Sequence, residues 1–388
     1  YRVMPGGLTR VALEAGGRFI SMQRGGASKD TWVLSEKPVE EVSLLHPAGH
    51  DIELRRVGNN LPSRLADNFY WLGRYAERAD ATARMLRSTL LRFNPENTGG
   101  AMPLLTPILD TLEAQGQIMD VVKRPELRQN AEALEAELLA VIFDSDRPGS
   151  LRQIAAQLQR LAMMVRDRLS TDTWRVLTEF DDRVMAPVAQ STLLAGEAIG
   201  LLNEVILSLA SFHGLAMENM TRAQGWRFLD MGHRLERAVY LCNFTQSALR
   251  SPEADNASLL ETVLEVADCS ITYRSRYNLL PHIAAVYDLV LLDETSPRSL
   301  LYQLNQLVKH FDRLPREKQS ALPSPGQRLL LDSVTRLRLA DPTELGRLSK
   351  GWNESAFAEV IKHVGAALPK LSDAIAVSYF AHSGIYRQ

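Results

Sequence analysis

The sequence predicts a mainly α-helical protein, a large α-helical bundle with an internal pseudo-repeat, preceded by a small β-rich segment. Three observations support this prediction. From Leu61 onward, apolar residues recur at helical spacing with little strand-like alternation. The residues before it form short apolar runs separated by glycine turns. The phrase Gly-x-x-x-Glu-Arg-Ala occurs twice, beginning at Gly73 and at Gly232. We therefore expect residues 1–58 to form one unit with a linker, and residues 59–388 to form the helical domain.

The first unit reads as β structure and turns. Short strands are expected at residues 9–13, 18–22 and 31–34, with a turn at residues 5–7 and a polar linker over residues 35–60. Three short strands bury too little apolar surface to be stable alone. Since the chain also begins at Tyr1, we expect it to be a piece of a longer polypeptide with a larger sheet domain upstream.

The helical domain is expected to begin at Pro62, with Ser63 as the N-cap of a helix that runs to about Phe93. The apolar spacing predicts further helices beyond a break at residues 94–100. These helices are expected at residues 103–115, 126–143, 149–169, 171–182, 186–215, 219–249, 256–276, 279–293, 297–313, 325–340 and 353–380.

The two copies of the repeated phrase share more than their letters. Each lies in a helix with the same apolar stripe, and in each the glycine and glutamate lie together on one flank of it. The stripes are Phe69, Leu72, Ala76, Ala79 and Ala83 in one copy, and Phe228, Met231, Leu235, Ala238 and Cys242 in the other. Glycine in a helix interior costs about 1 kcal/mol relative to alanine. Its repeated use predicts that something approaches the backbone closely beside each glutamate.

The charged flank of the first copy has three interpretations. Asp67, Trp71, Arg74 and Arg78 are spaced three or four residues apart, so they lie along one line of the helix. This line is a buried structural ion-pair network, a ligand site or a solvated surface. The aromatic residues Tyr70 and Trp71 on this side indicate that the face is covered, which favours the first two.

Two later segments supply further candidate residues. Tyr273, Arg274 and Arg276 cluster at a helix end, where the arginines either meet the motif glutamates or an anionic ligand, or compensate the helix dipole. Ser296 and Pro297 are expected to open a helix as N-cap and first residue. Arg298 would then oppose the dipole, which predicts an acidic partner. The complete candidate cluster is Asp67, Arg74, Glu77, Arg78, Glu236, Arg237, Tyr273, Arg274, Arg276 and Arg298.

The sequence gives little support for a metal site, a nucleophilic catalytic site or a phosphate-binding loop. No metal site is expected, because Glu-x-x-His is absent and His233-x-x-Glu236 has the reverse order in only one copy. No spacing suggests a Ser-His-Asp or Cys-His arrangement, and no Walker-type loop is present. A weak phosphate-loop candidate precedes a strand, although a hairpin turn is favoured there; its residues are Gly25, Gly26, Ser28 and Lys29.

Composition limits partners and compartment. A net charge of −2 argues against nucleic-acid binding. No apolar run approaches the length of a membrane span and no signal peptide is seen, so no membrane partner is expected. Cys242 and Cys269 lie in apolar helical contexts without metal or disulfide spacing. They are expected to be buried free thiols, which favours a reducing, cytoplasmic location.

Residues 65–79, which read LADNFYWLGRYAERA, closely resemble the hallmark of the bacterial Alpha-E family, a helical domain of unknown function. The segments ITYRSRY at 271–277 and SPRSL at 296–300, and Tyr379-Phe380, resemble its later motifs. The resemblance covers about residues 61–388. Many members carry an Arg-Glu-Asn-Ala-Arg-like phrase before a Val-Arg-x-x-Leu-Ser segment. Here residues 158–164 lack its acidic group and its asparagine, so any site built on that phrase is altered or lies between other helices.

Residues 4–34 resemble the C-terminal end of circularly permuted ATP-grasp proteins, which are encoded beside Alpha-E proteins or fused to them. This resemblance implies that the chain is the helical accessory or substrate-binding domain of an ATP-grasp-type peptide or amide ligase, and is not catalytic alone. Its partners would be the upstream ATP-grasp domain and a peptide, amine or carboxylate substrate. ATP and Mg²⁺ would bind upstream, with no cofactor in this chain. The alternatives are a structural or interaction module with a buried Glu-Arg ion-pair network and, more weakly, an independent metal-dependent helical-bundle enzyme.

Overall fold

The computed structural model describes residues 6–11, 27–34, 61–93, 98–118, 131–186, 195–249, 256–278, 280–315, 322–346 and 355–380. The chain divides into two compact units, Tyr1–Val57 and Gly58–Gln388. Within the described residues, the structure is mainly helical, as the sequence predicts, with a small two-stranded sheet.

The first unit contains an antiparallel pair of strands, β1 (Gly6–Val11) and β2 (Ala27–Trp32), in which Gly6 lies opposite Trp32 and Val11 opposite Ala27. The expected turn at residues 5–7 is wrong for Gly6 and Gly7, which lie in β1. A Cβ at Gly6 would lie 2.7 Å from the Thr31 carbonyl oxygen, so glycine permits close pairing there. All of β2 is exposed, and the expected strand at 18–22 lies outside the described residues.

Within the described residues, the second unit is built from helices. Their bounds are α1 (Ser63–Arg92), α2 (Thr98–Ala114), α4 (Ala131–Phe143), α5 (Leu151–Met164), α6 (Thr171–Val184), α7 (Ala195–Asn219), α8 (Gln224–Ala248), α9 (Ala257–Val266), α10 (Ser270–Tyr277), α11 (Ile283–Tyr287), α12 (Leu300–Phe311), α13 (Pro325–Arg338), α14 (Pro342–Leu345) and α15 (Ala356–Ile375). A 3₁₀ turn covers Arg166–Arg168, and π-helical turns cover Asp288–Leu292 and Ala376–Phe380.

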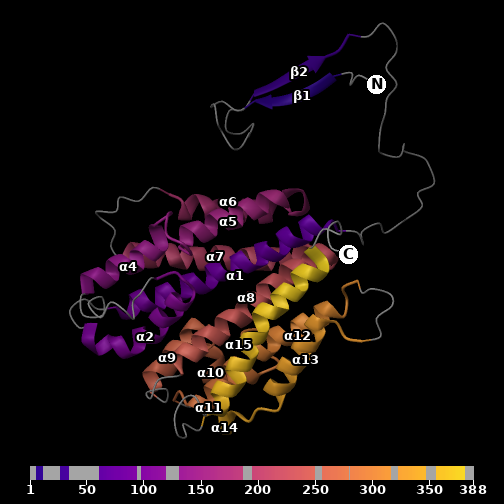
Figure 1. Cartoon of the computed structure of the whole chain (residues 1–388). Helices are drawn as coiled ribbons and strands as arrows, with labels where there is room; N and C mark the ends of the chain where they lie inside the picture. The colour runs from indigo at the N-terminus through magenta and orange to yellow at the C-terminus, as the bar shows by residue number, and fades with distance from the viewer. Residues whose placement is uncertain are drawn as a thin grey trace. The chain divides into compact units, whose positions relative to one another are not determined.

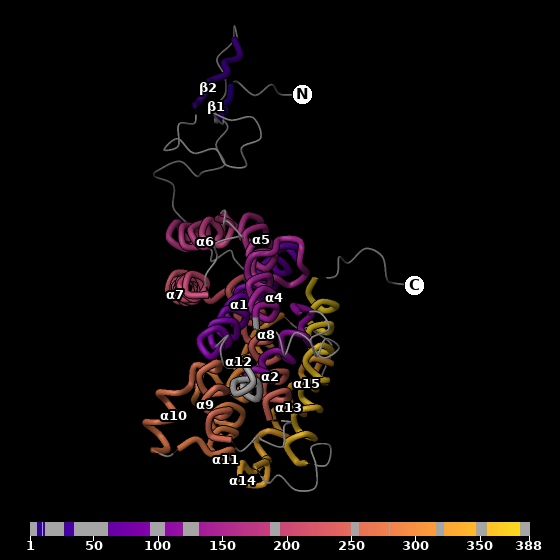
Figure 2. The backbone as a smooth tube through the Cα atoms, turned by 90° about the vertical axis from the view of Figure 1, so that its left-hand side faces the viewer, coloured from indigo at the N-terminus to yellow at the C-terminus, as the bar shows by residue number. Residues whose placement is uncertain are grey.

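The two helices that carry the repeated phrase, α1 and α8, pack on each other through the centre of this unit (Figure 1). On one side, α5 and α7 pack on α1, and α6 packs on α5 and α7. On the other side, α12 and α15 pack on α8, with α13 against both of them. Figure 2 shows the same order of layers from a perpendicular direction. The repeated helices are therefore covered on both sides by helices outside the repeat.

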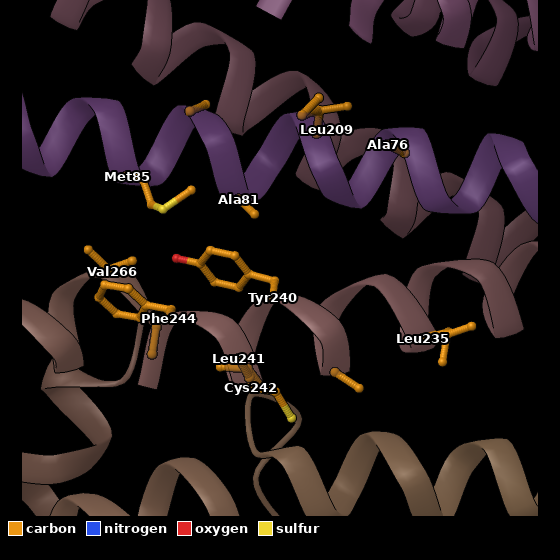
Figure 3. Close-up of a cluster of buried hydrophobic side chains, with 14 of the residues drawn as sticks. Ala76, Ala81, Met85, Leu209, Leu235, Tyr240, Leu241, Cys242, Phe244 and Val266 are labelled. Atoms are coloured by element: carbon orange, nitrogen blue, oxygen red, sulfur yellow. The ribbon is translucent and has the colours of Figure 1, made fainter. Parts of the chain in front are cut away.

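The predicted apolar stripes lie in the core of the helical unit. Every residue of both stripes is buried, which confirms this prediction. Figure 3 shows that Tyr240 reaches from α8 toward Ala81 and Met85 of α1, and its ring stacks on Phe244 with centroids 5.8 Å apart. The expectation of buried free thiols is also confirmed for Cys242 and Cys269. Small residues along α1 let its neighbours approach from several sides.

The repeated glycines mark the point where α1 and α8 cross. A Cβ at Gly73 would lie 2.0 Å from the Leu229 carbonyl oxygen, and a Cβ at Gly232 would lie 2.0 Å from the Tyr70 carbonyl oxygen. No side chain fits such a distance, so only glycine allows this crossing. The prediction of a close approach beside each glutamate is confirmed, and the approaching group is the backbone of the other repeat helix.

Several predicted helix boundaries are wrong, including the following three. Ser63 is the first residue of α1 and its side chain makes no capping bond, because Pro62 occupies the cap position. The expected helix at 256–276 is broken between α9 and α10, where Asp268 adopts a left-handed conformation with φ of 58°. Helix α12 is capped by Ser299 rather than Ser296, so Arg298 precedes the helix instead of lying in its first turn.

Helix α7 departs from the expectation that no run approaches membrane-span length. Among the described helices it is the one that is long and apolar enough to cross a membrane by length and composition. In this structure it packs on α1 and α6, with Leu202, Leu209 and Phe212 buried. A core helix of a helical bundle passes the same test, so this feature is weak evidence for a membrane span.

Candidate functional site

The two motif glutamates form reciprocal ion pairs with arginines of the opposite helix, across the α1–α8 crossing. Glu77 of α1 accepts from Arg237 of α8, with Nε 2.6 Å from Oε1 and Nη2 2.8 Å from Oε2. Glu236 of α8 accepts from two arginines of α1, with Arg78 Nε 2.7 Å from Oε1 and Arg74 Nε 2.6 Å from Oε2. Each motif thus supplies a glutamate to the other helix and an arginine to the other glutamate.

We call Glu77, Arg237 and His233 the Glu77 cluster, and Glu236, Arg74 and Arg78 the Glu236 cluster. His233 occupies the position in α8 that Arg74 occupies in α1, and its Nδ1 lies 3.1 Å from Glu77 Oε2. The local symmetry therefore places one histidine where the other half has an arginine.

Both glutamates are ionised despite their burial. Glu77 is 2% exposed and Glu236 is 7% exposed. Burial alone would raise each pKa, but the charge of Arg237 and then the neighbouring His233 hold the pKa of Glu77 well below its usual range. In the same way, Arg74 and Arg78 outweigh burial and lower the pKa of Glu236. These carboxylates act as fixed negative charges between the helices.

The arginines of the Glu236 cluster are covered by aromatic rings and by the C-terminal helix. The guanidinium of Arg74 lies 4.9 Å from the Trp71 ring centroid and donates to Ser372 of α15 at 3.0 Å. Arg78 lies 5.1 Å from the Tyr75 ring. Tyr70 is buried, with its hydroxyl 2.9 Å from that of Ser372. The prediction that this aromatic face is covered is confirmed, which argues against a solvated surface.

A second charged group lies one turn further along α1. Arg84 Nε donates to Asp80 at 2.9 Å and its Nη1 lies 3.1 Å from Asp268. Arg298 donates to Asp268 at 2.7 Å, which confirms the prediction that Arg298 has an acidic partner. Burial and then the like charges of Arg237 and Arg84 lower the pKa of Arg298. The left-handed turn at Asp268 places its carboxylate between two arginines from different elements.

The other predicted members of the cluster lie elsewhere. Tyr273 is buried, and its hydroxyl donates to the Leu280 carbonyl and accepts from the His282 amide, so it holds the turn after α10. Arg274 is exposed, and Arg276 pairs with Asp293 at the surface. Of the alternatives for these arginines, contact with the motif glutamates is wrong, because burying Tyr273 turns the neighbouring positions of the short α10 to solvent.

The remaining candidates lie outside the Glu77 cluster and the Glu236 cluster as defined above. Asp67 is half-buried on α1, two turns before Arg74. Ser28 and Lys29 of the phosphate-loop candidate lie in β2, opposite Arg10 and Thr9 of β1. The other two residues of that candidate, Gly25 and Gly26, lie outside the described residues. The described half of this candidate is therefore paired strand rather than loop.

One residue of the site had no sequence signal. His213 of α7 lies against His233, with ring centroids 4.1 Å apart. Glu77, His213 and His233 each offer a ligand atom, and these atoms all lie within 4.8 Å of one another. Since the three residues come from three helices, no spacing along the chain reveals the group. Among the described residues, Glu77, His213 and His233 are the group that could hold a metal ion.

Residues 61–380 match the family named Alpha-E, described as "a predicted alpha-helical domain with a conserved ER motif". The uncharacterized protein Rv2567 of Mycobacterium tuberculosis is 30% identical, covering 99% of this chain and 44% of that protein. The uncharacterized protein Mb2434c of Mycobacterium bovis is 40% identical over 17% of this chain and 10% of its own length.

A shorter similarity, 64% identity over 33 residues, is to the uncharacterized protein ML0605 of Mycobacterium leprae, covering 8% of this chain and 6% of that protein. No solved structure matches the chain. The chain therefore spans less than half the length of the curated relatives that it matches.

Proposed function

Because the chain belongs to the Alpha-E family, a domain of unknown function, we propose that it is a helical accessory domain of a larger ATP-dependent ligase, with a structural Glu-Arg motif. In this proposal the domain holds the substrate or the modified partner, and catalysis takes place in an upstream ATP-grasp domain. The observation that supports a non-catalytic motif is that internal arginines occupy both motif glutamates.

A catalytic carboxylate needs properties that these glutamates lack. A general base works best with a pKa near the operating pH and with access to the proton that it removes. Glu77 and Glu236 are buried and their pKa values are lowered, and each is already bonded to arginine through both oxygens. Their geometry suits a lock that fixes the crossing of α1 and α8.

The ligase association has two supports. The relatives that this chain matches along nearly all its length are more than twice as long as the matched region, so they have room for another domain. Residues 4–34 resemble the end of a circularly permuted ATP-grasp protein, and the described part is a β-strand pair. ATP and Mg²⁺ would bind upstream in such a protein. The second candidate is an interaction module without a ligase, which the internal ion pairs support equally.

The full-length relative Rv2567 separates these candidates. ADP formation should be measured with ATP, Mg²⁺ and each amino acid in turn, for the whole protein, for a version without the region matching 61–380, and for this 388-residue chain alone. We expect ADP formation from the whole protein, a clear loss without the helical region, and none from the chain alone. ADP formation by the chain alone would show that catalysis lies in the helical domain. A whole protein that forms no ADP, or one unaffected by the deletion, would favour the interaction module.

A second measurement tests the structural motif. Replacing the glutamate of Rv2567 that aligns with Glu236 by glutamine should lower the melting temperature but leave the rate of ADP formation intact at temperatures where the variant is folded. A variant that keeps its melting temperature but loses activity would instead identify Glu236 as part of a functional site.

A further inference from the structure

The Glu77 cluster differs from the Glu236 cluster by one positive charge. Glu236 is paired with two guanidinium groups, Arg74 and Arg78. Glu77 is paired with one guanidinium, Arg237, and His233 stands in the position that matches Arg74. The half with the more deeply buried glutamate therefore has the fewer permanent cations, although a buried carboxylate depends strongly on its partners.

The two histidines carry nitrogens with no hydrogen bond. His213 Nε2 and His233 Nδ1 are buried, and neither finds a hydrogen-bond partner among the described residues, although His233 Nδ1 is at ion-pair distance from Glu77. Leaving a buried polar atom unpaired costs about 1–3 kcal/mol. Burial is the main cause that lowers the pKa of both histidines, so both imidazoles are neutral near pH 7. Neutral imidazole is the form that binds a metal ion.

A small cavity adjoins these histidines. It has a volume of about 50 Å³ and is lined by His213, His233 and Asp230 together with Met217 and Trp226. Roughly 10–15 Å³ is enough for one water molecule. Asp230 adds a carboxylate to the wall, where it pairs with Arg234 at 3.1 Å and with His310 at 2.7 Å. There is room beside the histidines for a water ligand.

We propose that Glu77, His213 and His233 bind one divalent transition metal ion, with Zn²⁺ as the best-suited example, and that water from the adjoining cavity completes the coordination. Two imidazoles and one carboxylate form a three-ligand set that Zn²⁺ uses with a fourth, water-filled position. Their ligand atoms lie within 4.8 Å of one another, a separation that a single ion can bridge with metal–ligand bonds of about 2.0–2.2 Å after modest side-chain adjustment.

The bound ion supplies the cation that Arg74 supplies to the other glutamate. Arg237 Nε keeps its bond to Glu77 Oε1, and Oε2 exchanges its contact with Arg237 Nη2 for the metal. The nearby charges are Arg237 and Arg234 as cations and Glu77 and Asp230 as anions. The metal links α1, α7 and α8 at one point. This proposal does not depend on the association with a ligase.

The test uses the purified 388-residue chain after treatment with EDTA. Zn²⁺ binding should be measured by calorimetry and Co²⁺ binding by visible absorbance, which reports coordination number. We expect one equivalent to bind. His213→Gln and His233→Arg should each weaken binding by at least about tenfold, the lower end of the effect of residues that only support metal ligands. His233→Arg copies the arginine of the other half, so it should fold.

His363→Gln is the matched control, because His363 is a partly exposed histidine paired with Asp332 on the surface. It should bind metal as the wild type does, and circular dichroism should show that all variants keep their helices. Absence of stoichiometric binding by the folded wild-type chain would overturn the proposal. So would unchanged binding by both His213→Gln and His233→Arg, or an equal loss in His363→Gln.

Discussion

The Glu77 cluster and the Glu236 cluster share one motif and one crossing, yet their surroundings differ. The Glu77 side chain is 2% exposed and that of its partner Arg237 is 10% exposed. The Glu236 side chain is 9% exposed, and that of its partner Arg78 is 32% exposed. A sequence repeat therefore sets the backbone geometry and the pairing. The helices outside the repeat, α7 on one side and α15 on the other, set the water access and the additional partners.

The largest difference is expected when each glutamate is neutralised. Glu77→Gln should lower the free energy of unfolding by about 3–5 kcal/mol, because it leaves the buried charge of Arg237 without its carboxylate. Glu236→Gln should cost less, because Arg78 can turn to solvent and Arg74 keeps its bond to Ser372. Urea denaturation followed by circular dichroism measures both. Equal losses would show that the two clusters are equivalent in energy and that the difference in exposure has no effect.

Unlike the two glutamates, the two motif glycines should lose equal amounts of stability when they are replaced. Gly73→Ala and Gly232→Ala each place a Cβ 2.0 Å from a carbonyl oxygen of the other helix. Each should destabilise the domain by about 1–3 kcal/mol or more, because both helices must move apart.

Gly214→Ala in α7 is the control, since its Cβ would meet nothing within 4 Å. It should stabilise the chain by up to about 1 kcal/mol. Losses that differ strongly between Gly73→Ala and Gly232→Ala would contradict a symmetric crossing.

Acid should affect the two clusters at different pH in metal-free protein. The folded-state pKa values of His213 and His233 lie below their usual value of about 6.5. The unfolded chain therefore binds more protons, so this stability is complete above about pH 6.5 and falls as the pH drops, by up to about 1.4 kcal/mol per pH unit for each histidine. The lowered pKa of Glu236 causes loss only below about pH 4.5.

Melting temperatures measured between pH 4 and pH 8 test this order. His213→Gln should flatten the upper part of the profile and leave the part below pH 4.5 unchanged. A wild-type profile that is flat from pH 8 to pH 5 would refute the assignment of buried neutral histidines.

The smallest difference is expected for arginine to lysine changes. Arg78→Lys should cost less than about 1 kcal/mol, because its ion pair is partly exposed. Arg237→Lys should cost about 1.5–3 kcal/mol, because lysine cannot make both bonds to Glu77. Denaturant unfolding distinguishes them, and a costlier Arg78→Lys would reverse our ranking of the two clusters.

Local patterns predicted the parts of the molecule that depend on local spacing. The helical class, the two apolar stripes and the close approach at Gly73 and Gly232 all follow from residues within a few turns. The break at Asp268 did not, because its left-handed conformation is stabilised by Arg84 and Arg298 from distant elements.

The side-chain pairings within the site could not be predicted from the sequence either. Which arginine meets Glu77 depends on the register between helices 160 residues apart in the chain. His213 lies in a helix with no copy of the motif, so its position beside His233 depends on how α7 packs. Arg274 and Arg276 resemble ligand-binding arginines by type, but the orientation of α10 exposes both.

The crossing of α1 and α8 also has a consequence during translation, because the ribosome makes α1 long before α8. Glu77 and Arg237 are 160 residues apart, so a ribosome adding about 5–20 residues per second needs roughly 8–32 s to make the second after the first. Throughout that interval, Phe69 and Leu72 on α1 lack the helix that will bury them. During translation, the stripe of α1 is therefore apolar surface without its α8 partner, of the kind that chaperones bind.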